Sequence, residues 1–148
     1  MKEIMMKIIG TQMNADMEED KMEFITEGKL YQKGDSMYLL YDESEISGMP
    51  GCKTRLKLKG GTIKMKRIGE KVGIDTEIEF EKGKRYTGYY DTPFGAIEME
   101  VLTNHIENNL TPEGKGTLDI DYHISLKGLA EGRNKLNIQL MQGKREGI

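Results

Sequence analysis

Arg67 and Glu43 are the two charged residues that we expect inside this protein. A guanidinium group can hold a carboxylate or a phosphate through parallel hydrogen bonds, whereas an interior charge without a partner is strongly unfavourable. Two interpretations follow: the pair closes one end of the interior as an ion pair, or Arg67 anchors the anionic group of a small ligand. The hydroxyl groups that we expect beside it belong to Thr26, Tyr41, Thr54 and Tyr90.

Other residues that catalyse reactions or bind metals occur singly. His105 and His123 have no partner at metal-ligand spacing. His123 lies on a polar face, whereas His105 alternates with Val101 and Thr103, so we expect a structural histidine that faces inward. Cys52 is the one cysteine, and no catalytic motif surrounds it. We therefore expect no metal, no cofactor and no enzymatic activity.

Composition excludes several classes of partner. The 148 residues carry a net charge of −3 with both signs interleaved, so we expect no binding to nucleic acid or to an anionic membrane. Lys2 and Lys7 interrupt the apolar N-terminus, where a signal peptide needs about 7–15 apolar residues. No apolar run approaches the roughly 18 residues of a membrane span. We expect one cytoplasmic domain over residues 1–148.

The elements that position these residues are β-strands, because hydrophobic and polar residues alternate with a period of two. Glycine-bearing turns separate the alternating segments, so neighbours should pair antiparallel. The sequence predicts an all-β fold: a single antiparallel up-and-down barrel of about eight to ten strands. The clearest segments are 53–59, 62–69, 72–80, 117–126 and 134–140.

Turn lengths predict the register of the hairpins. A two-residue loop at Gly60-Gly61 places Thr54 opposite Arg67, and one at Glu70-Lys71 would place Arg67 opposite Ile74.

A loop at Gly34-Asp35 places Gly28 opposite Tyr41, and Thr26 opposite Glu43. Glu43, Thr54 and Arg67 then share one end of the barrel, with their side chains directed inward.

The segment "GYYDTPFGAIEMEV" leaves two registers open, because either Tyr89 or Tyr90 can face inward. The turn chemistry of Thr-Pro-Phe-Gly favours Tyr89, through a three-residue loop that ends in a glycine bulge. Apolar content favours Tyr90, and we prefer that register.

One outer face carries a basic stripe. We expect the acidic residues of "DTEIEFE" to balance it, because opposite charges on neighbouring strands attract. The stripe comprises Lys53, Arg55, Lys57, Lys59, Lys64 and Lys66.

Several collinear segments resemble the YwiB-like family, uncharacterised bacterial proteins with a calycin-like (lipocalin-like) β-barrel. The resemblance implies a barrel and a bacterial cytoplasmic setting, and it implies no activity. The matching segments are "ITEGKLY" (25–31), "YDESEISGM" (41–49), "KTRLKL" (53–58), "KRIG" (66–69), "FEKGK" (80–84), "YDTPFGAIEMEVLT" (90–103) and "IDYHISLKG" (120–128).

The leading hypothesis is a non-enzymatic barrel that binds a small, partly apolar anionic ligand. The alternative is a filled barrel that acts as a structural or protein-interaction module, as a homodimer or with another partner. A hydrolase or isomerase that acts through Glu43 is a remote third.

Overall fold

Ten β-strands make up the part of the chain that the computed structural model describes, which comprises residues 2–13, 18–43, 51–69, 73–92, 95–127 and 129–141, with Thr92 described by its backbone alone. These ranges contain no helix, and therefore none that could cross a membrane. The strands are β1 (Lys2–Met13), β2 (Glu19–Lys33), β3 (Ser36–Asp42), β4 (Lys53–Lys59), β5 (Thr62–Gly69), β6 (Ile74–Glu81), β7 (Arg85–Thr92), β8 (Gly95–Asn108), β9 (Gly116–Leu126) and β10 (Ala130–Met141).

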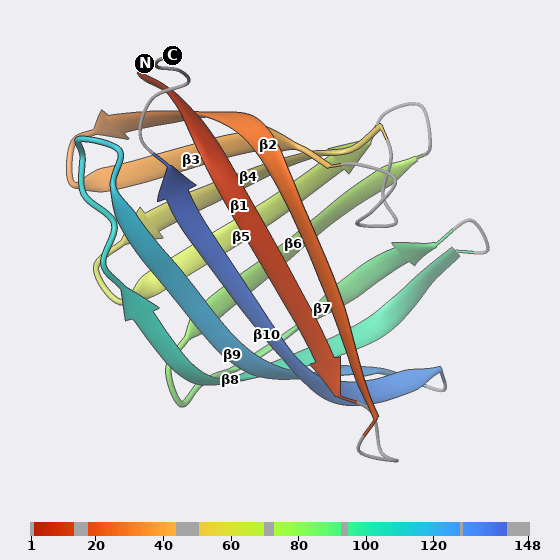
Figure 1. The fold of residues 1–148 in the computed structure, drawn as a ribbon. Helices are drawn as coiled ribbons and strands as arrows, with labels where there is room; N and C mark the ends of the chain where they lie inside the picture. The colour runs from red at the N-terminus through yellow and green to blue at the C-terminus, as the bar shows by residue number, and fades with distance from the viewer. Residues whose placement is uncertain are drawn as a thin grey trace.

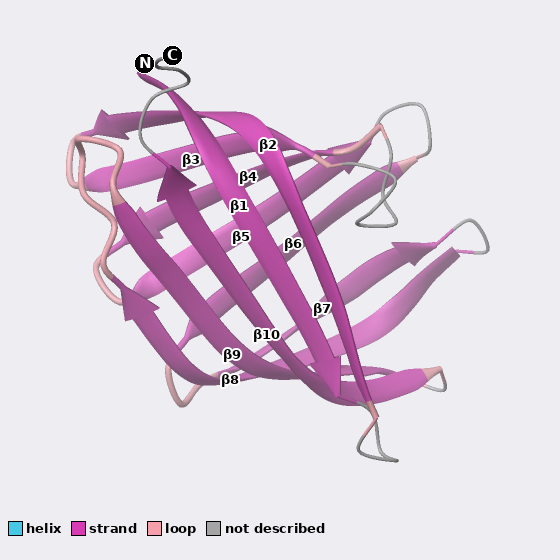
Figure 2. Cartoon of the chain, in the orientation of Figure 1, coloured by secondary structure: helices cyan, strands magenta, loops and turns pink. Residues whose placement is uncertain are grey.

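The strands form one antiparallel sheet that curls into a nearly closed barrel (Figure 1). Their order across the sheet is β6-β5-β4-β3-β2-β1-β10-β9-β8-β7, so strands that are consecutive in the chain pair with each other, except β6 with β7, and β1 also pairs with β10. The two edges of the sheet, β6 and β7, are consecutive strands (Figure 2). The prediction of an all-β, antiparallel up-and-down barrel is confirmed.

Two predicted hairpin loops are confirmed. The β2–β3 ladder ends at the residues that flank Gly34-Asp35, and the β4–β5 ladder ends at those that flank Gly60-Gly61. The first residue of each loop is a glycine with a positive φ, 63° at Gly34 and 58° at Gly60. Residues with a side chain rarely adopt this conformation. Thr54 consequently lies opposite Arg67, as the sequence predicted.

The predicted register of β5 and β6 is wrong by two residues. Their ladder ends at Gly69 opposite Ile74, so residues 70–73 connect the strands, and Arg67 lies opposite Thr76 rather than Ile74. The predicted loop residues Glu70 and Lys71 lie outside the described residues. A shift of two residues leaves every side chain on its predicted face, because side chains alternate with a period of two.

Tyr90, not Tyr89, faces the interior. Tyr90 lies opposite Ile97 and is half-buried, whereas Tyr89 is 64% exposed. The ladder of β7 and β8 ends at Thr92 opposite Gly95, which leaves a two-residue connection whose residues lie outside the described ranges. The preferred register is confirmed, and the argument from turn chemistry is wrong.

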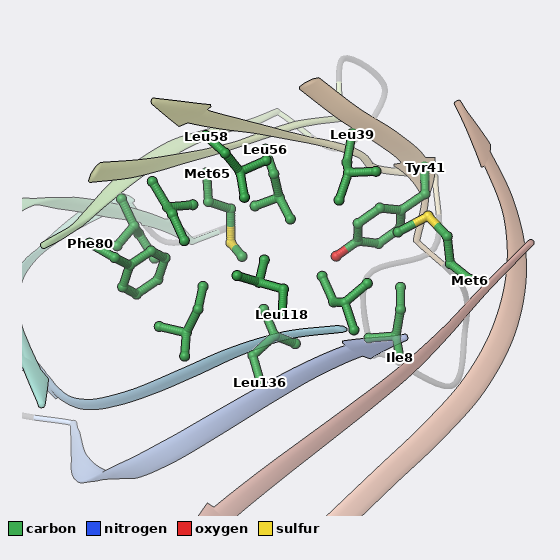
Figure 3. Packing of buried hydrophobic residues seen from close by; sticks show 14 of the residues in the cluster. Met6, Ile8, Leu39, Tyr41, Leu56, Leu58, Met65, Phe80, Leu118 and Leu136 are labelled. Atoms are coloured by element: carbon green, nitrogen blue, oxygen red, sulfur yellow. The ribbon is translucent and has the colours of Figure 1, made fainter. Parts of the chain in front are cut away.

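The interior is filled by apolar side chains from strands on opposite sides of the barrel (Figure 3). Leu39, Leu56, Phe80 and Leu118 are fully buried, although they come from four different strands. Burial of a side chain of this size contributes about 1.5–3 kcal/mol. The core therefore fixes which face of each strand points inward, and with it the position of the inward polar residues.

Side chains, not a backbone ladder, join β6 to β7. The hydroxyl of Tyr86 donates a hydrogen bond to the backbone oxygen of Glu77 (3.0 Å), and the backbone N–H of Asp75 donates to Oδ2 of Asp91 (3.0 Å). Gly88 makes room for the first contact, since a Cβ there would lie 3.0 Å from the Tyr86 hydroxyl oxygen. We call this junction the β6–β7 seam.

Candidate functional site

A carboxylate and a guanidinium meet at one end of the barrel, inside it. Glu43 directly follows β3, and its backbone N–H donates to the oxygen of Cys52 (2.8 Å). Its side chain is only 2% exposed, and its Oε2 accepts a short hydrogen bond from the hydroxyl of Thr54. Nε of Arg67 lies 3.5 Å from the same oxygen. The predicted ion pair is therefore present.

Arg67 is only partly satisfied by this pair. Nε is within ion-pair distance of Glu43, but it is buried and forms no hydrogen bond with any described residue. The Arg67 side chain remains 21% exposed. A guanidinium has five N–H donors, and unpaired buried donors are costly. Arg67 therefore has at least one N–H donor, at Nε, that the described residues leave without a hydrogen bond.

Tyr41 adds a neutral hydrogen-bonding group beside the charged pair. Burial raises the pKa of the Tyr41 phenol well above its usual range, and the charge of Glu43 adds to this, against smaller opposing effects of Arg67 and Thr54. Figure 3 shows the Tyr41 hydroxyl directed into the barrel. Tyr41 is thus neutral and can donate a hydrogen bond.

Arg67 stays charged in this setting. Burial alone lowers its pKa, but Tyr41 and Glu43, followed by Tyr122 and Tyr90, outweigh burial and raise the pKa above the usual value. Arg67 therefore keeps its positive charge beside Glu43.

A cavity of about 330 Å³ adjoins these groups. Such a volume falls within the range of about 300–1,000 Å³ that small-molecule sites occupy. Its polar wall combines Arg67 and Glu43 with three tyrosines. The rest of the lining is mostly apolar and also includes Thr11, Gln12, Glu131, Asn134 and Lys135. The residues that define its character are Phe24, Tyr41, Glu43, Arg67, Ile78, Tyr90, Tyr122, Ile124 and Leu136.

Larger hollows, of about 440 Å³ and 880 Å³, lie along β7–β10. The arginines of the larger one already have close partners: Arg85 lies 2.7 Å from Glu100, and Arg133 lies 2.6 Å from Asp121. We place the candidate site in the interior instead, because the Nε of Arg67 is buried there and forms no hydrogen bond with a described residue.

Comparison with known proteins places the chain in a family. Residues 6–138 match a domain of unknown function, DUF1934. The chain belongs to the DUF1934 family. It is similar in fold to the crystal structure of the ywiB protein from Bacillus subtilis, with a TM-score of 0.76 and 23% sequence identity over 95% of this chain and 93% of that one. A search of the curated proteins found no match.

The predicted resemblance to YwiB-like proteins is confirmed by the family match and by the shared fold. Neither finding assigns a ligand or a reaction to the DUF1934 domain.

In this DUF1934 barrel, most of the predicted site residues come together. Tyr41, Glu43, Arg67 and Tyr90 line the cavity, and Thr54 binds Glu43 from the neighbouring strand.

Thr26 does not join the site. It pairs with Met6 of β1 rather than with Glu43, because the β2–β3 ladder stops at Gly28 and Tyr41. Its hydroxyl contacts the backbone oxygen of Glu27 (3.4 Å), and it does not line the cavity.

Sequence reasoning did not include Tyr122, which lines the cavity and lies near enough to Arg67 to raise its pKa. The amide of Asn134 reaches the Tyr122 hydroxyl (3.4 Å) from β10. The signal that could have found Tyr122 is its phase in the segment 117–126, which places it on the same face as Leu118 and Ile120.

The described residues contain no group of three or more His, Cys, Asp or Glu side chains that could hold a metal ion. His123 is exposed on the outer face, as predicted, and contacts the amide of Asn104 (3.0 Å). His105 is also exposed, contrary to the prediction, because a β-bulge between Thr103 and His105 changes the phase of β8.

Proposed function

We propose that this DUF1934 protein is a non-enzymatic binding protein for a small, partly apolar anion that occupies the interior cavity. The observation that carries the proposal is the position of Arg67, a charged guanidinium in the cavity wall whose Nε forms no hydrogen bond with a described residue. We also propose a cytoplasmic bacterial setting, with which the free, buried Cys52 is compatible.

The chemistry of the wall favours a carboxylate with an apolar body. Arg67 would bind the carboxylate through N–H groups of its guanidinium, and the hydroxyls of Tyr90 and Tyr122 would complete the hydrogen bonds. Phe24 and Ile78 would contact the apolar part. Glu43 also lines the cavity, so its carboxylate would repel an anion that bound without the guanidinium between them.

Thermal unfolding in the presence of benzoate, 4-phenylbutyrate and octanoate tests the proposal. A ligand at 100 times its Kd stabilises a protein by about 2.7 kcal/mol, which corresponds to roughly 5–10 °C in a chain of this size. We expect at least one acid to raise the melting temperature and its matched uncharged amide, such as benzamide, to have no effect.

The double variant Glu43→Gln/Arg67→Gln provides the protein control, because it removes both charges and leaves polar groups that can bind each other. We expect it to fold and to lose the response to the acids. Arg55→Gln, on the outer face of β4, should respond like the wild type. No stabilisation by any of the acids, or equal stabilisation by acid and amide, would rule out the anion site.

A further inference from the structure

Four cationic side chains lie next to one another on the outer face of β4 and β5. The register places Arg55 opposite Lys66 and Lys57 opposite Lys64. Residues two apart on one strand point the same way and lie about 7 Å apart, and neighbouring strands lie about 4.8 Å apart. We call these four residues the cation block.

Carboxylates flank the cation block on one side only. On β6, Glu79 lies opposite Lys64, and Glu77 lies opposite Lys66. The Lys64 amine is 4.0 Å from Glu79, at the limit of an ion pair. The expected balance of the basic stripe by β6 is therefore confirmed for β5, and it does not extend to β4.

On the side of β3, the cation block meets apolar and aromatic side chains. Arg55 lies opposite Leu40, and Lys57 lies opposite Tyr38. Tyr38 stacks on Tyr31 with ring centroids 4.7 Å apart, and the Lys57 amine lies 6.0 Å from the Tyr38 centroid. Within the described part of the chain, Arg55 and Lys57 form no ion pair.

This arrangement costs stability, because like charges directly opposite each other on neighbouring strands repel. Both cross-strand pairs of the cation block are of this kind, and the described residues neutralise only its β5 side. An external anion would relieve the repulsion. We propose that the cation block is a docking site for an acidic segment of a partner protein.

Charge complementarity favours an extended acidic peptide, whose alternate carboxylates repeat about every 7 Å, like the cations of β4. Acidic residues bound the cation block at both ends of β4, where Asp42 lies 3.8 Å from Lys53 and Asp35 lies 4.0 Å from Lys59. A longer phosphate backbone would meet these acids.

A nucleic-acid base would also have to compete for the Tyr38 ring, because Tyr31 stacks on it and the Lys57 amine lies 6.0 Å from its centroid. The observations therefore favour a short acidic peptide over a nucleic acid.

Fluorescence anisotropy with a labelled peptide of alternating Glu and Ser tests the proposal at low and at physiological ionic strength. We expect Arg55→Gln/Lys57→Gln to weaken binding about tenfold, which corresponds to about 1.4 kcal/mol. Lys21→Gln/Lys115→Gln changes the net charge equally at exposed positions away from β4 and β5, and it should leave binding unchanged. Binding should also weaken as salt rises.

Three results would overturn the proposal: no binding of the peptide at low salt, equal loss in both double variants, or tighter binding of oligouridylate than of the peptide. Unfolding does not confound the test, since removal of like charges should keep or raise the melting temperature of Arg55→Gln/Lys57→Gln. The interior variant Glu43→Gln/Arg67→Gln should bind the peptide normally, so failure of one proposal leaves the other standing.

Discussion

Replacement of Arg67 by methionine tests whether the charged pair is truly interior. Methionine keeps much of the length and apolar volume of the arginine side chain, so the change chiefly removes the positive charge. Glu43, whose side chain is 2% exposed, then keeps its hydrogen bond from Thr54 and loses its counter-ion. The variant therefore isolates the contribution of the charge that faces Glu43.

Loss of one partner from a buried ion pair costs about 3–5 kcal/mol. Arg67 is 21% exposed, and its Nε contact of 3.5 Å is long, so we expect the lower part of this range, about 3 kcal/mol. In a chain of this size each kcal/mol lowers the melting temperature by roughly 2–4 °C. Arg67→Met should therefore melt roughly 6–12 °C below the wild type.

Circular dichroism during thermal unfolding, with urea titration for the free energy, measures the effect. Arg55→Met is the matched control, because it makes the same substitution at an exposed position among like charges on the adjacent strand. We expect its melting temperature to stay the same or to rise. The double variant Glu43→Met/Arg67→Met should recover most of the loss, since apolar residues can replace a buried pair at little cost.

Equal effects of Arg67→Met and Arg55→Met would refute the reasoning, because Glu43 would then be solvated. So would a double variant that loses the sum of the two single losses.

Two further predictions concern packing and acid stability. Gly28→Ala should lower the free energy of unfolding by about 1–3 kcal/mol, because the new Cβ would overlap Sδ of the fully buried Met6. Gly61→Ala is the control: its Cβ meets open space, so the free energy of unfolding should change by less than about 0.5 kcal/mol. Equal urea midpoints for the two variants would contradict this prediction. Hydrogen bonds from Arg133 lower the pKa of Asp121 from 3.8 to about 2. Because the folded value is depressed, the stabilisation is present above pH 3.8 and disappears as the pH falls toward 2. Urea unfolding should therefore show Arg133→Gln less stable than the wild type at neutral pH and equal to it near pH 2, and a difference independent of pH would exclude this linkage.

Alternation and glycine turns were sufficient to predict the barrel and the inward face of most strands. Thr54 lies opposite Arg67 because Gly60 adopts a left-handed conformation that a two-residue turn needs, and this can be recognised in a sequence. The length of the β5–β6 connection could not be recognised in the same way, because the sequence there contains no turn motif that specifies it. The error does not affect the candidate site, because a register shift of two residues keeps the Arg67 side chain on the inner face.

Features that depend on bulges and on closure of the sheet were not predictable. His105 was placed inside by its spacing from Val101, and a β-bulge turned it outward. Tyr122 shares the inward face of Leu118 and Ile120, but its approach to Arg67 joins β9 to β5 across the barrel. That proximity follows from the curvature of the whole sheet rather than from any local pattern.

Because no ladder joins β6 to β7, the chain can be opened at the β6–β7 seam without loss of a strand pairing. Nearly every ladder joins strands that are adjacent in the sequence, and β1 with β10 is the exception. A circular permutant opened between Glu81 and Arg85, with the old ends joined, would convert that exception into one more hairpin without removing any ladder. Its contact order would fall, and chains of lower contact order fold faster.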